Sequence, residues 1–344
     1  MMMVHGKTKT KGRTVSIVIP TYNNESTLGE CLRSIKNQDY PQELIDIIIA
    51  DGGSNDRTVE IGKSFDVMIT HNPFRVEERG RPHAIEKYAK GEIIGSIDAD
   101  NILPNKDWIT RAMRTFDDPE ISAVDSLFFS YRPSDNLITK YATFPGGDDP
   151  IAAYLGINDR LCFWNGRWTG MPHKEEDMGD YLKVSLVKGK IPALGCNGYF
   201  FRKKIFDVVP HDPFIHSIFV KELVNRGFNK MAKVKQGLIH LQSGEILPFF
   251  KKKLRRIFRR QSGEISAFDY GLDRMRVILS LLYISTIVLP LKDMVMGFIR
   301  KPSLAWAFHP VATFGLFGMY AYHTIKGVVQ GDNRLKVNNY SERY

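Results

Sequence analysis

Short apolar runs alternate with polar loops along the first hundred residues of this 344-residue chain. Four runs rich in β-branched residues are typical of buried strands, at residues 14–20, 44–50, 67–70 and 93–97. Between them, residues 28–35 carry apolar side chains at the spacing of a helix face, and residues 81–90 predict a second helix that ends at Gly91. Strands that alternate with helices in this way predict an α/β fold with a doubly wound sheet.

Polar residues gather where the predicted strands end. We expect Ser26 to cap the helix over residues 28–35, and Ser54 or Asn55 to cap a helix that follows the second strand. The carboxyl ends of parallel strands line one crevice, and α/β proteins bind their ligands there. The polar loops after the first, second and fourth runs are therefore the candidate site.

Asp98 and Asp100 follow the fourth apolar run. On an extended backbone, positions one residue apart point to the same side, so both carboxylates can bind one hard divalent cation and the phosphates that it carries. Two desolvated carboxylates without a cation would repel each other. The alternative is a pair of solvated turn aspartates after an ordinary strand.

Other residues near these strand ends suit a nucleotide. Asp51 can accept hydrogen bonds from a base or a ribose, and the ring of Tyr22 offers a packing surface. Arg75, Arg79 and Arg81 are candidate phosphate contacts. The first strand is followed by no Gly-x-Gly-x-x-Gly motif, and the sequence contains no Walker lysine loop, which disfavours dinucleotide-binding and P-loop folds.

Four motifs together resemble those of the family 2 glycosyltransferases of the GT-A fold: residues 17–23, residues 51–58, Gly91-Glu92 and Asp98-Ala99-Asp100. The resemblance implies a Rossmann-like mixed sheet, a UDP- or GDP-sugar donor, and Mg2+ or Mn2+ on the donor diphosphate. It places the donor contacts at Pro20, Thr21, Tyr22, Glu25, Asp51, Gly53, Arg81, Asp98 and Arg202. It places the metal at Asp98 and Asp100, with His240 brought toward it; the alternative for His240 is a buried, hydrogen-bonded histidine.

Residues 116–244 are expected to form the acceptor half of a domain that spans residues 14–244. A strand is expected within residues 116–129. Residues 133–190 are expected to form an irregular acceptor lid with the acidic run Glu175-Glu176-Asp177, or alternatively a solvated loop. Residues 195–202 resemble a second motif of the family, in which Arg202 is a diphosphate or scaffold contact.

One feature of the family is missing from the chain. Family members carry a Glu-Asp pair ahead of a glycine such as Gly227, with the aspartate as catalytic base, and this chain has Ile215-His216 there. Transfer still needs a group that removes the proton of the acceptor hydroxyl. His216, whose ordinary pKa suits a base near neutrality, and Asp212 are equal candidates.

The C-terminal part combines cations with apolar segments. Residues 245–270 show an apolar helix face, and seven cations lie between residues 251 and 260, which predicts a basic amphipathic helix on an anionic membrane surface. Residues 271–330 hold two apolar stretches that predict a helical hairpin dipping into or spanning the membrane. The alternative is a pair of core helices in a soluble C-terminal domain.

Composition agrees with a partner that bears phosphates. The chain has 48 Lys and Arg against 38 Asp and Glu, a net charge of +10. Because the cations cluster beside apolar segments, we expect a membrane and no nucleic acid. Three widely spaced cysteines indicate a reducing compartment, and the polar, basic residues 1–13 predict a disordered lead-in without a secretory signal. We therefore expect the catalytic domain on the cytoplasmic side of the cell membrane, with residues 331–344 as a polar tail.

The leading hypothesis is an inverting, metal-dependent glycosyltransferase that moves a sugar from a nucleotide donor to a membrane-held, polyprenyl-linked acceptor. One alternative is direct transfer to polyprenyl phosphate, as in dolichyl-phosphate mannose synthases. A second is a catalytically degenerate fold that binds a nucleotide or lipid, for which the missing Glu-Asp pair is the support. Intact Asp98 and Asp100 favour an enzyme, because a module without catalysis has no chemical need for a metal.

Overall fold

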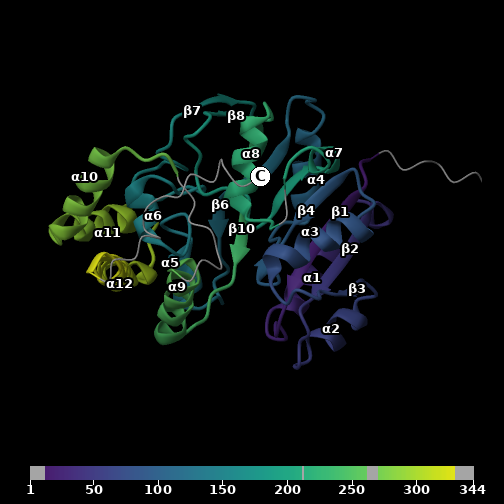
Figure 1. Cartoon of the computed structure of the whole chain (residues 1–344), viewed down its shortest axis with the longest axis horizontal. Coiled ribbons are helices and arrows are strands. Elements are labelled where there is room, and N and C mark those ends of the chain that lie inside the picture. The colour runs from purple at the N-terminus through teal and green to yellow at the C-terminus, as the bar shows by residue number, and fades with distance from the viewer. Residues whose placement is uncertain (1–11, 211–212, 262–269, 330–344) are drawn as a thin grey trace, which may run out of the picture. The chain divides into compact units, whose positions relative to one another are not determined.

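The computed structural model describes residues 12–210, 213–261 and 270–329. The chain divides into two compact units (Figure 1). The first unit comprises Met1–Asp125 and Cys196–Ile215, and the second comprises Ser126–Gly195 and His216–Tyr344. The division falls within strand β6 (Ala123–Ser130), and not at the expected residue 116, and the chain later returns to the first unit.

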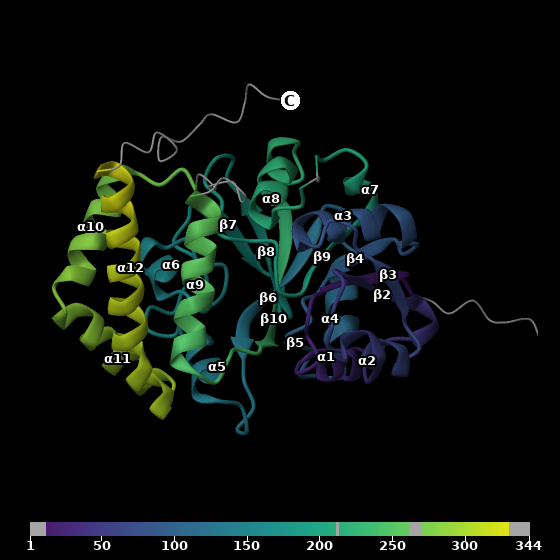
Figure 2. The same cartoon turned by 60° about the horizontal axis from the view of Figure 1, so that its bottom comes forward.

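The first unit contains a mixed sheet with the strand order β3-β2-β1-β4-β9-β6. Its elements are β1 Val15–Thr21, α1 Leu28–Lys36, η1 Gln42–Leu44, β2 Ile45–Asp51, α2 Thr58–Ser64, β3 Met68–His71, α3 Glu77–Tyr88, β4 Ile93–Ser96, β5 Asn101–Ile102, α4 Trp108–Thr115, β9 Tyr199–Arg202 and α7 Lys203–Phe206. Strands β1 to β4 pair in parallel, and β9 is antiparallel to both β4 and β6. Figure 2 shows α1 and α2 on one side of these strands and α3 on the other. The predicted α/β class with a doubly wound mixed sheet is confirmed.

Register brings the ends of β1 and β2 together. Val15 lies opposite Ile45, and six residues later Thr21 lies opposite Asp51. Every residue of β1 is buried, because this strand is flanked by β2 and β4 and covered by helices. The apolar run thus fixes the sheet, while its polar ends stay at the rim.

The predicted helix starts are wrong in detail. Helix α1 begins at Leu28 with Thr27 at its N-cap, so Ser26 is not the cap. Helix α2 begins at Thr58, three residues beyond Asn55, and Asp56 Oδ1 accepts the Thr58 backbone N–H at 2.9 Å. Helix α3 starts four residues earlier than predicted and ends at Tyr88. Neither α1 nor α2 has a side-chain bond from its N-cap residue, because the loops before them pair with each other instead.

The second unit combines short strands with helices. Its elements are α5 Leu137–Ala142, α6 Pro150–Leu155, β7 His173–Asp177, β8 Tyr181–Leu186, α8 His216–Asn225, β10 Lys230–His240, α9 Ile246–Gln261, α10 Arg274–Ser285, α11 Val288–Arg300, η2 Leu304–Phe308 and α12 His309–Val329. The strand order is β6-β10-β8-β7, and both β10 and β7 are antiparallel to β8. The expected irregular stretch at residues 133–190 is therefore wrong, since it contains two short helices and a β-hairpin.

An aromatic core joins the C-terminal helices to the rest of the second unit. Phe144, just after α5, stacks on Trp306 of η2 with ring centroids 4.5 Å apart. Tyr141 of α5 packs edge-on against Phe308, and Phe249 of α9 packs against the same ring. These rings are buried in one cluster with residues of α6, α10 and α12. The C-terminal helices thus share a core with the acceptor half and do not form a separate hairpin.

Helix α9 differs from the expected interfacial helix. Its apolar side faces protein: Phe249 is buried, and the Phe250 ring fills the space left by Gly315 of α12. Lys253 is only 4% exposed in its side chain and pairs with Asp148 at 2.6 Å. Protein covers this part of the helix face, whereas Leu247 and Phe258 of α9 are 63% and 48% exposed, and the binding of α9 to a membrane stays a prediction.

No single helix of the described residues has both the length and the apolar character needed to cross a membrane. Helices α10 and α11 meet those criteria only as a pair, and an 83° bend separates them.

Candidate active site

The loop after β2 is organised by a buried carboxylate. Asp51 Oδ2 accepts the backbone N–H groups of Gly53 and Ser54, each at 3.0 Å. Its Oδ1 accepts the Ser54 hydroxyl at 2.5 Å and the Thr21 hydroxyl at 3.2 Å. Gly53 has φ +89°, a backbone angle that favours glycine. Two predicted donor contacts, Thr21 and Asp51, are thus brought together, and Asp51 also sets the conformation of the turn.

The loop after β1 is joined to the loop after β2. Asn23 donates its backbone N–H to the Ser54 hydroxyl at 2.9 Å, and its side chain accepts the Asn55 N–H at 3.0 Å. Glu25 Oε2 accepts the Arg57 N–H at 3.1 Å. Tyr22 belongs to the same loop and is 57% exposed, while Pro20 is buried in β1. The result is a braced polar rim with one exposed aromatic ring, which suits packing of a base.

The two aspartates lie in a turn and not on an extended strand. Strand β4 ends at Ser96, and the Asn101 N–H donates to the Asp98 carbonyl at 2.9 Å. The expected alternation argument therefore does not apply to them, because the backbone reverses at residues 98–101. Both carboxylates nevertheless belong to one four-residue turn.

Arg81 pairs with Asp98, and its contact with a donor phosphate stays a prediction. It comes from α3, its side chain is 1% exposed, and its NH2 lies 2.5 Å from Asp98 Oδ1. Its NH1 donates to the Ser96 hydroxyl. A buried guanidinium in this position fixes the orientation of the Asp98 carboxylate.

Asn101 is a functional residue that sequence reasoning missed. It is fully buried, and its Oδ1 accepts the Asp98 N–H at 3.1 Å. Its Nδ2 donates to Asp100 Oδ1 at 3.1 Å and to Asn197 Oδ1 at 3.0 Å. One amide thus ties both aspartates of the turn to the loop before β9. The sequence signal that could have identified Asn101 is its position directly after Asp100.

A second missed contact is Cys31 of α1. Its thiol donates to the Asp98 carbonyl at 3.6 Å. Burial, and then the nearby carboxylates of Asp100 and Asp98, raise the pKa of this thiol far above its ordinary value. The thiol therefore stays neutral, and its hydrogen bond connects α1 to the turn of residues 98–101.

The turn fits a divalent cation that shares its ligands with a substrate. Among the described residues no group of three His, Cys, Asp or Glu side chains is arranged to hold a metal. Mg2+, however, is commonly bound through one or two carboxylates, with water and substrate phosphates completing its shell. Asp98 and Asp100 offer such a pair of hard oxygen ligands on a braced backbone.

Arg202 contacts three backbone carbonyls of the first unit, and its contact with the donor diphosphate stays a prediction. Its Nε donates to the Ile121 carbonyl at 2.8 Å, and its NH2 donates to the Phe116 and Asp118 carbonyls at 2.8 and 3.0 Å. Burial lowers the pKa of this guanidinium, and its N–H groups donate to these carbonyls. Arg202 therefore holds the end of α4 to β9.

Of the two candidate bases, only His216 lies within the described residues. His216 is the first residue of α8 and is half-buried, and a Cβ on Gly195, which has φ +108°, would lie 2.9 Å from its carbonyl oxygen. Asp212 lies outside the described residues. The acidic run is on β7, where Glu175 accepts the indole N–H of Trp168 at 3.0 Å. The role of His216 as a base stays a prediction.

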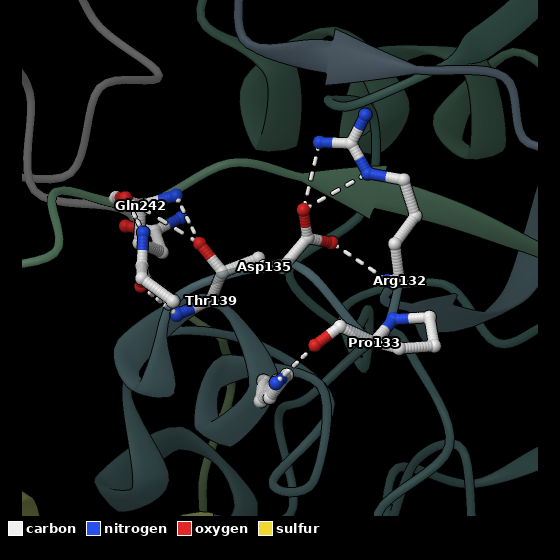
Figure 3. Close-up of polar contacts among 7 residues, drawn as sticks. Arg132, Pro133, Asp135, Thr139 and Gln242 are labelled. Carbon is white, nitrogen blue, oxygen red and sulfur yellow. Dashed lines mark hydrogen bonds and ion pairs between the residues drawn. The ribbon is translucent and has the colours of Figure 1, made fainter.

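His240 is the last residue of β10, and the chain after it is held firmly (Figure 3). The Gln242 N–H donates to the Thr139 hydroxyl at 2.8 Å, and Asn136 Nδ2 donates to the Gln242 carbonyl at 2.9 Å. Beside them, Arg132 and Asp135 form an ion pair at 2.7 Å. These bonds fix the end of β10 to α5. The metal role of His240 stays a prediction.

Comparison with known proteins identifies the family of the chain. The model of glycosyl transferase family 2 matches residues 16–207. A Methanococcus voltae protein, dolichyl N-acetyl-alpha-D-glucosaminyl phosphate 3-beta-D-2,3-diacetamido-2,3-dideoxy-beta-D-glucuronosyltransferase, is 23% identical over 94% of this chain and 99% of its own length. Glycosyltransferase AglE of Haloferax volcanii is 26% identical over 38% of this chain; the match spans 44% of AglE, less than half of its length.

Among solved structures, mannosyltransferase PcManGT from Pyrobaculum calidifontis, in complex with GDP-Man and Mn2+, is similar at a TM-score of 0.44 with 16% identity. That likeness covers 94% of this chain and 85% of PcManGT. The family match covers more than half of the chain and includes the paired loops after β1 and β2 and the Asp98–Asn101 turn. The chain therefore belongs to glycosyl transferase family 2 and is a nucleotide-sugar-dependent glycosyltransferase.

Proposed function

We propose that this glycosyltransferase is inverting and metal dependent, and that it transfers sugar to a membrane-held, polyprenyl-linked saccharide. The observation that carries the metal dependence is the turn of residues 98–101, where Arg81 and Asn101 brace two carboxylates. The name of the Methanococcus voltae relative specifies a dolichyl phosphate-linked acceptor, which supports the lipid part of the proposal.

Each braced residue has a defined task in this proposal. Arg81 orients Asp98 and Asn101 orients Asp100, so both carboxylates are positioned before the donor binds. A bound Mg2+ or Mn2+ would offset charge on the nucleoside diphosphate as it leaves. The Tyr22 ring and the loop ordered by Asp51 would receive the nucleoside.

The proton of the acceptor hydroxyl needs a base on the opposite side of the sugar from the leaving diphosphate. We assign this task first to His216, at the start of α8, because an ordinary histidine is partly neutral at physiological pH. Asp212 is the second candidate. Attack from that side in a single displacement inverts the anomeric centre.

The first experiment measures donor binding. The purified full chain is titrated with UDP- and GDP-sugars, with and without Mn2+, and its thermal stabilisation is recorded. Asp100→Asn should abolish the Mn2+-dependent part, while Asp66→Asn, an exposed aspartate of the same unit, should leave it unchanged. Equal donor binding in wild type and Asp100→Asn, with or without metal, would contradict the metal assignment.

The second experiment tests the base. His216→Ala should lower turnover by about 10²–10⁴-fold with donor affinity nearly unchanged, because the base acts in the transition state. His71→Ala, at an exposed histidine of β3, is the matched control and should retain turnover. If His216→Ala also retains turnover, the assignment to His216 is wrong and Asp212→Asn becomes the deciding variant.

A further inference from the structure

Helices α10 and α11 expose an unusually apolar surface, here called the α10–α11 face. Its members are each between 37% and 68% exposed: Ile278, Leu279, Leu281, Leu282, Ile287, Val288, Leu291, Val295, Phe298 and Ile299. Soluble proteins seldom expose so many large apolar side chains on two neighbouring helices, and exposed apolar surface of this kind marks binding sites. The composition of the α10–α11 face therefore indicates that another surface binds there.

The opposite side of these helices is fixed to the protein. Ile284 is fully buried in the aromatic core, and Ser280 donates its hydroxyl to the Tyr154 carbonyl at 3.0 Å. In α11, Gly297 lies against the Trp306 ring so closely that a Cβ would overlap it. Figure 2 shows α10 and α11 at the outer edge of the second unit, with α12 between them and α9. The apolar face is thus presented on a rigid support.

Cations outnumber acidic residues around the face. Residues 277–291 contain no charged side chain; they are preceded by Asp273, the exposed N-cap of α10, and by Arg274 and Arg276, and they are followed by Lys292 and Arg300. The only acidic residue between 274 and 301 is Asp293, which is buried and receives the Tyr283 hydroxyl at 3.2 Å. An apolar centre with cations at its rim is complementary to a bilayer that carries anionic lipids.

The geometry of the two helices favours lying in the membrane surface. They have 12 and 13 residues and meet at an 83° bend. One side of each is committed to the protein core and the other is apolar, which is the division expected of an interfacial helix. A spanning pair would have to give up its core contacts.

We propose that the α10–α11 face docks this enzyme in the plane of an anionic bilayer surface, without crossing it. The proposal deepens the membrane-held acceptor of the proposed function and rests on it only for its biological purpose. It also moves the membrane contact from α9 to α10 and α11, because Phe249, Phe250 and Lys253 of α9 are engaged by protein.

The test is flotation of the full chain with acceptor-free vesicles of phosphatidylcholine, alone or mixed with phosphatidylglycerol. The triple variant Leu279→Gln/Leu282→Gln/Val288→Gln should float at least about tenfold less, because binding strength scales with buried apolar area. The matched control, Met178→Gln/Val187→Gln/Val208→Gln, changes three residues of 41% to 48% exposure elsewhere and should float like wild type. Arg274→Gln/Lys292→Gln should remove the preference for phosphatidylglycerol and its salt dependence.

Depth is measured with a Thr286→Trp variant at the exposed junction of α10 and α11. Nitroxide lipids labelled near the headgroup should quench its added fluorescence more than lipids labelled near the bilayer centre. Stronger quenching by the deep label would overturn the in-plane arrangement.

Two further results would overturn the docking proposal. One is equal flotation of wild type and the triple variant. The other is a chain that forms dimers which the triple variant dissociates while vesicles stay unbound, since the face would then be a contact between copies. Mn2+-dependent donor stabilisation is recorded in parallel and should be unchanged in the triple variant, so failure of the membrane proposal is distinguished from failure of the proposed function.

Discussion

Replacing Asp98 should destabilise the fold, whereas replacing Asp100 should affect mainly metal-dependent donor binding. The difference follows from Arg81, whose side chain is 1% exposed and whose charged partner is Asp98 Oδ1 at 2.5 Å. Asp98→Ala leaves that guanidinium buried without its carboxylate. Removing one member of a buried pair costs about 3–5 kcal/mol. Because the Asp98 side chain is 24% exposed and water can reach the site, we expect about 3 kcal/mol.

Other substitutions at these residues should lower the free energy of unfolding by smaller amounts. Asp98→Asn keeps an oxygen acceptor for Arg81 but loses the charge, so we expect a cost of about 1.5 kcal/mol. Asp100→Asn removes the charge of a carboxylate that accepts one bond from Asn101, and should cost about 1 kcal/mol or less. Arg81→Met/Asp98→Ala should be more stable than Asp98→Ala alone, because no buried charge is left without a partner.

The assay is urea unfolding followed by circular dichroism, without metal or donor, so that only fold stability is measured. Thermal stabilisation by donor with Mn2+ is recorded separately for each variant. A cost below about 0.5 kcal/mol for Asp98→Ala, or a double variant no more stable than the single one, would refute the bracing role of this ion pair.

Two more predictions concern the second unit. Burial lowers the pKa of His309 to about 3, and its ring nitrogens lie 2.9 Å from the hydroxyls of Tyr141 and Tyr154. Because an unfolded histidine titrates near about 6.5, the free energy of unfolding should be highest above that pH and lower by about 2 kcal/mol at pH 5. Denaturant unfolding at both pH values measures this loss, and His309→Gln should remove it. Burial alone would raise the pKa of Asp148, but the charges of Lys253, Arg256 and Lys252 outweigh it and hold that pKa well below its usual range. Lys253→Met should therefore cost about 3–5 kcal/mol in a denaturant titration, Asp148→Asn/Lys253→Met less, and the exposed Lys251→Met almost nothing; equal stability of the two lysine variants would contradict it.

Sequence alone determined the sheet of the first unit and where along the chain its candidate site residues lie. Apolar runs of β-branched residues can be satisfied only by burial in strands, so β1, β2 and β4 lie within one or two residues of the predicted ranges. The polar motifs at the ends of these strands were recognisable because each motif consists of residues that are close together in the sequence. The same holds for Asp51 and Thr21, which in-register strands bring together.

Only the tertiary structure decided how polar groups are paired. Arg81 and Asp98 are 17 residues apart, and their contact depends on how α3 packs beside β4, so the sequence could equally suggest a phosphate contact. Helix α9 has the pattern of a membrane helix, yet Gly315 and Asp148, far away in sequence, cover its apolar side and its Lys253. An amphipathic pattern indicates that the apolar face of a helix must be covered, but it does not indicate whether protein or membrane covers it. For α9 that partner is protein, and for α10 and α11 the exposed face is left for another surface.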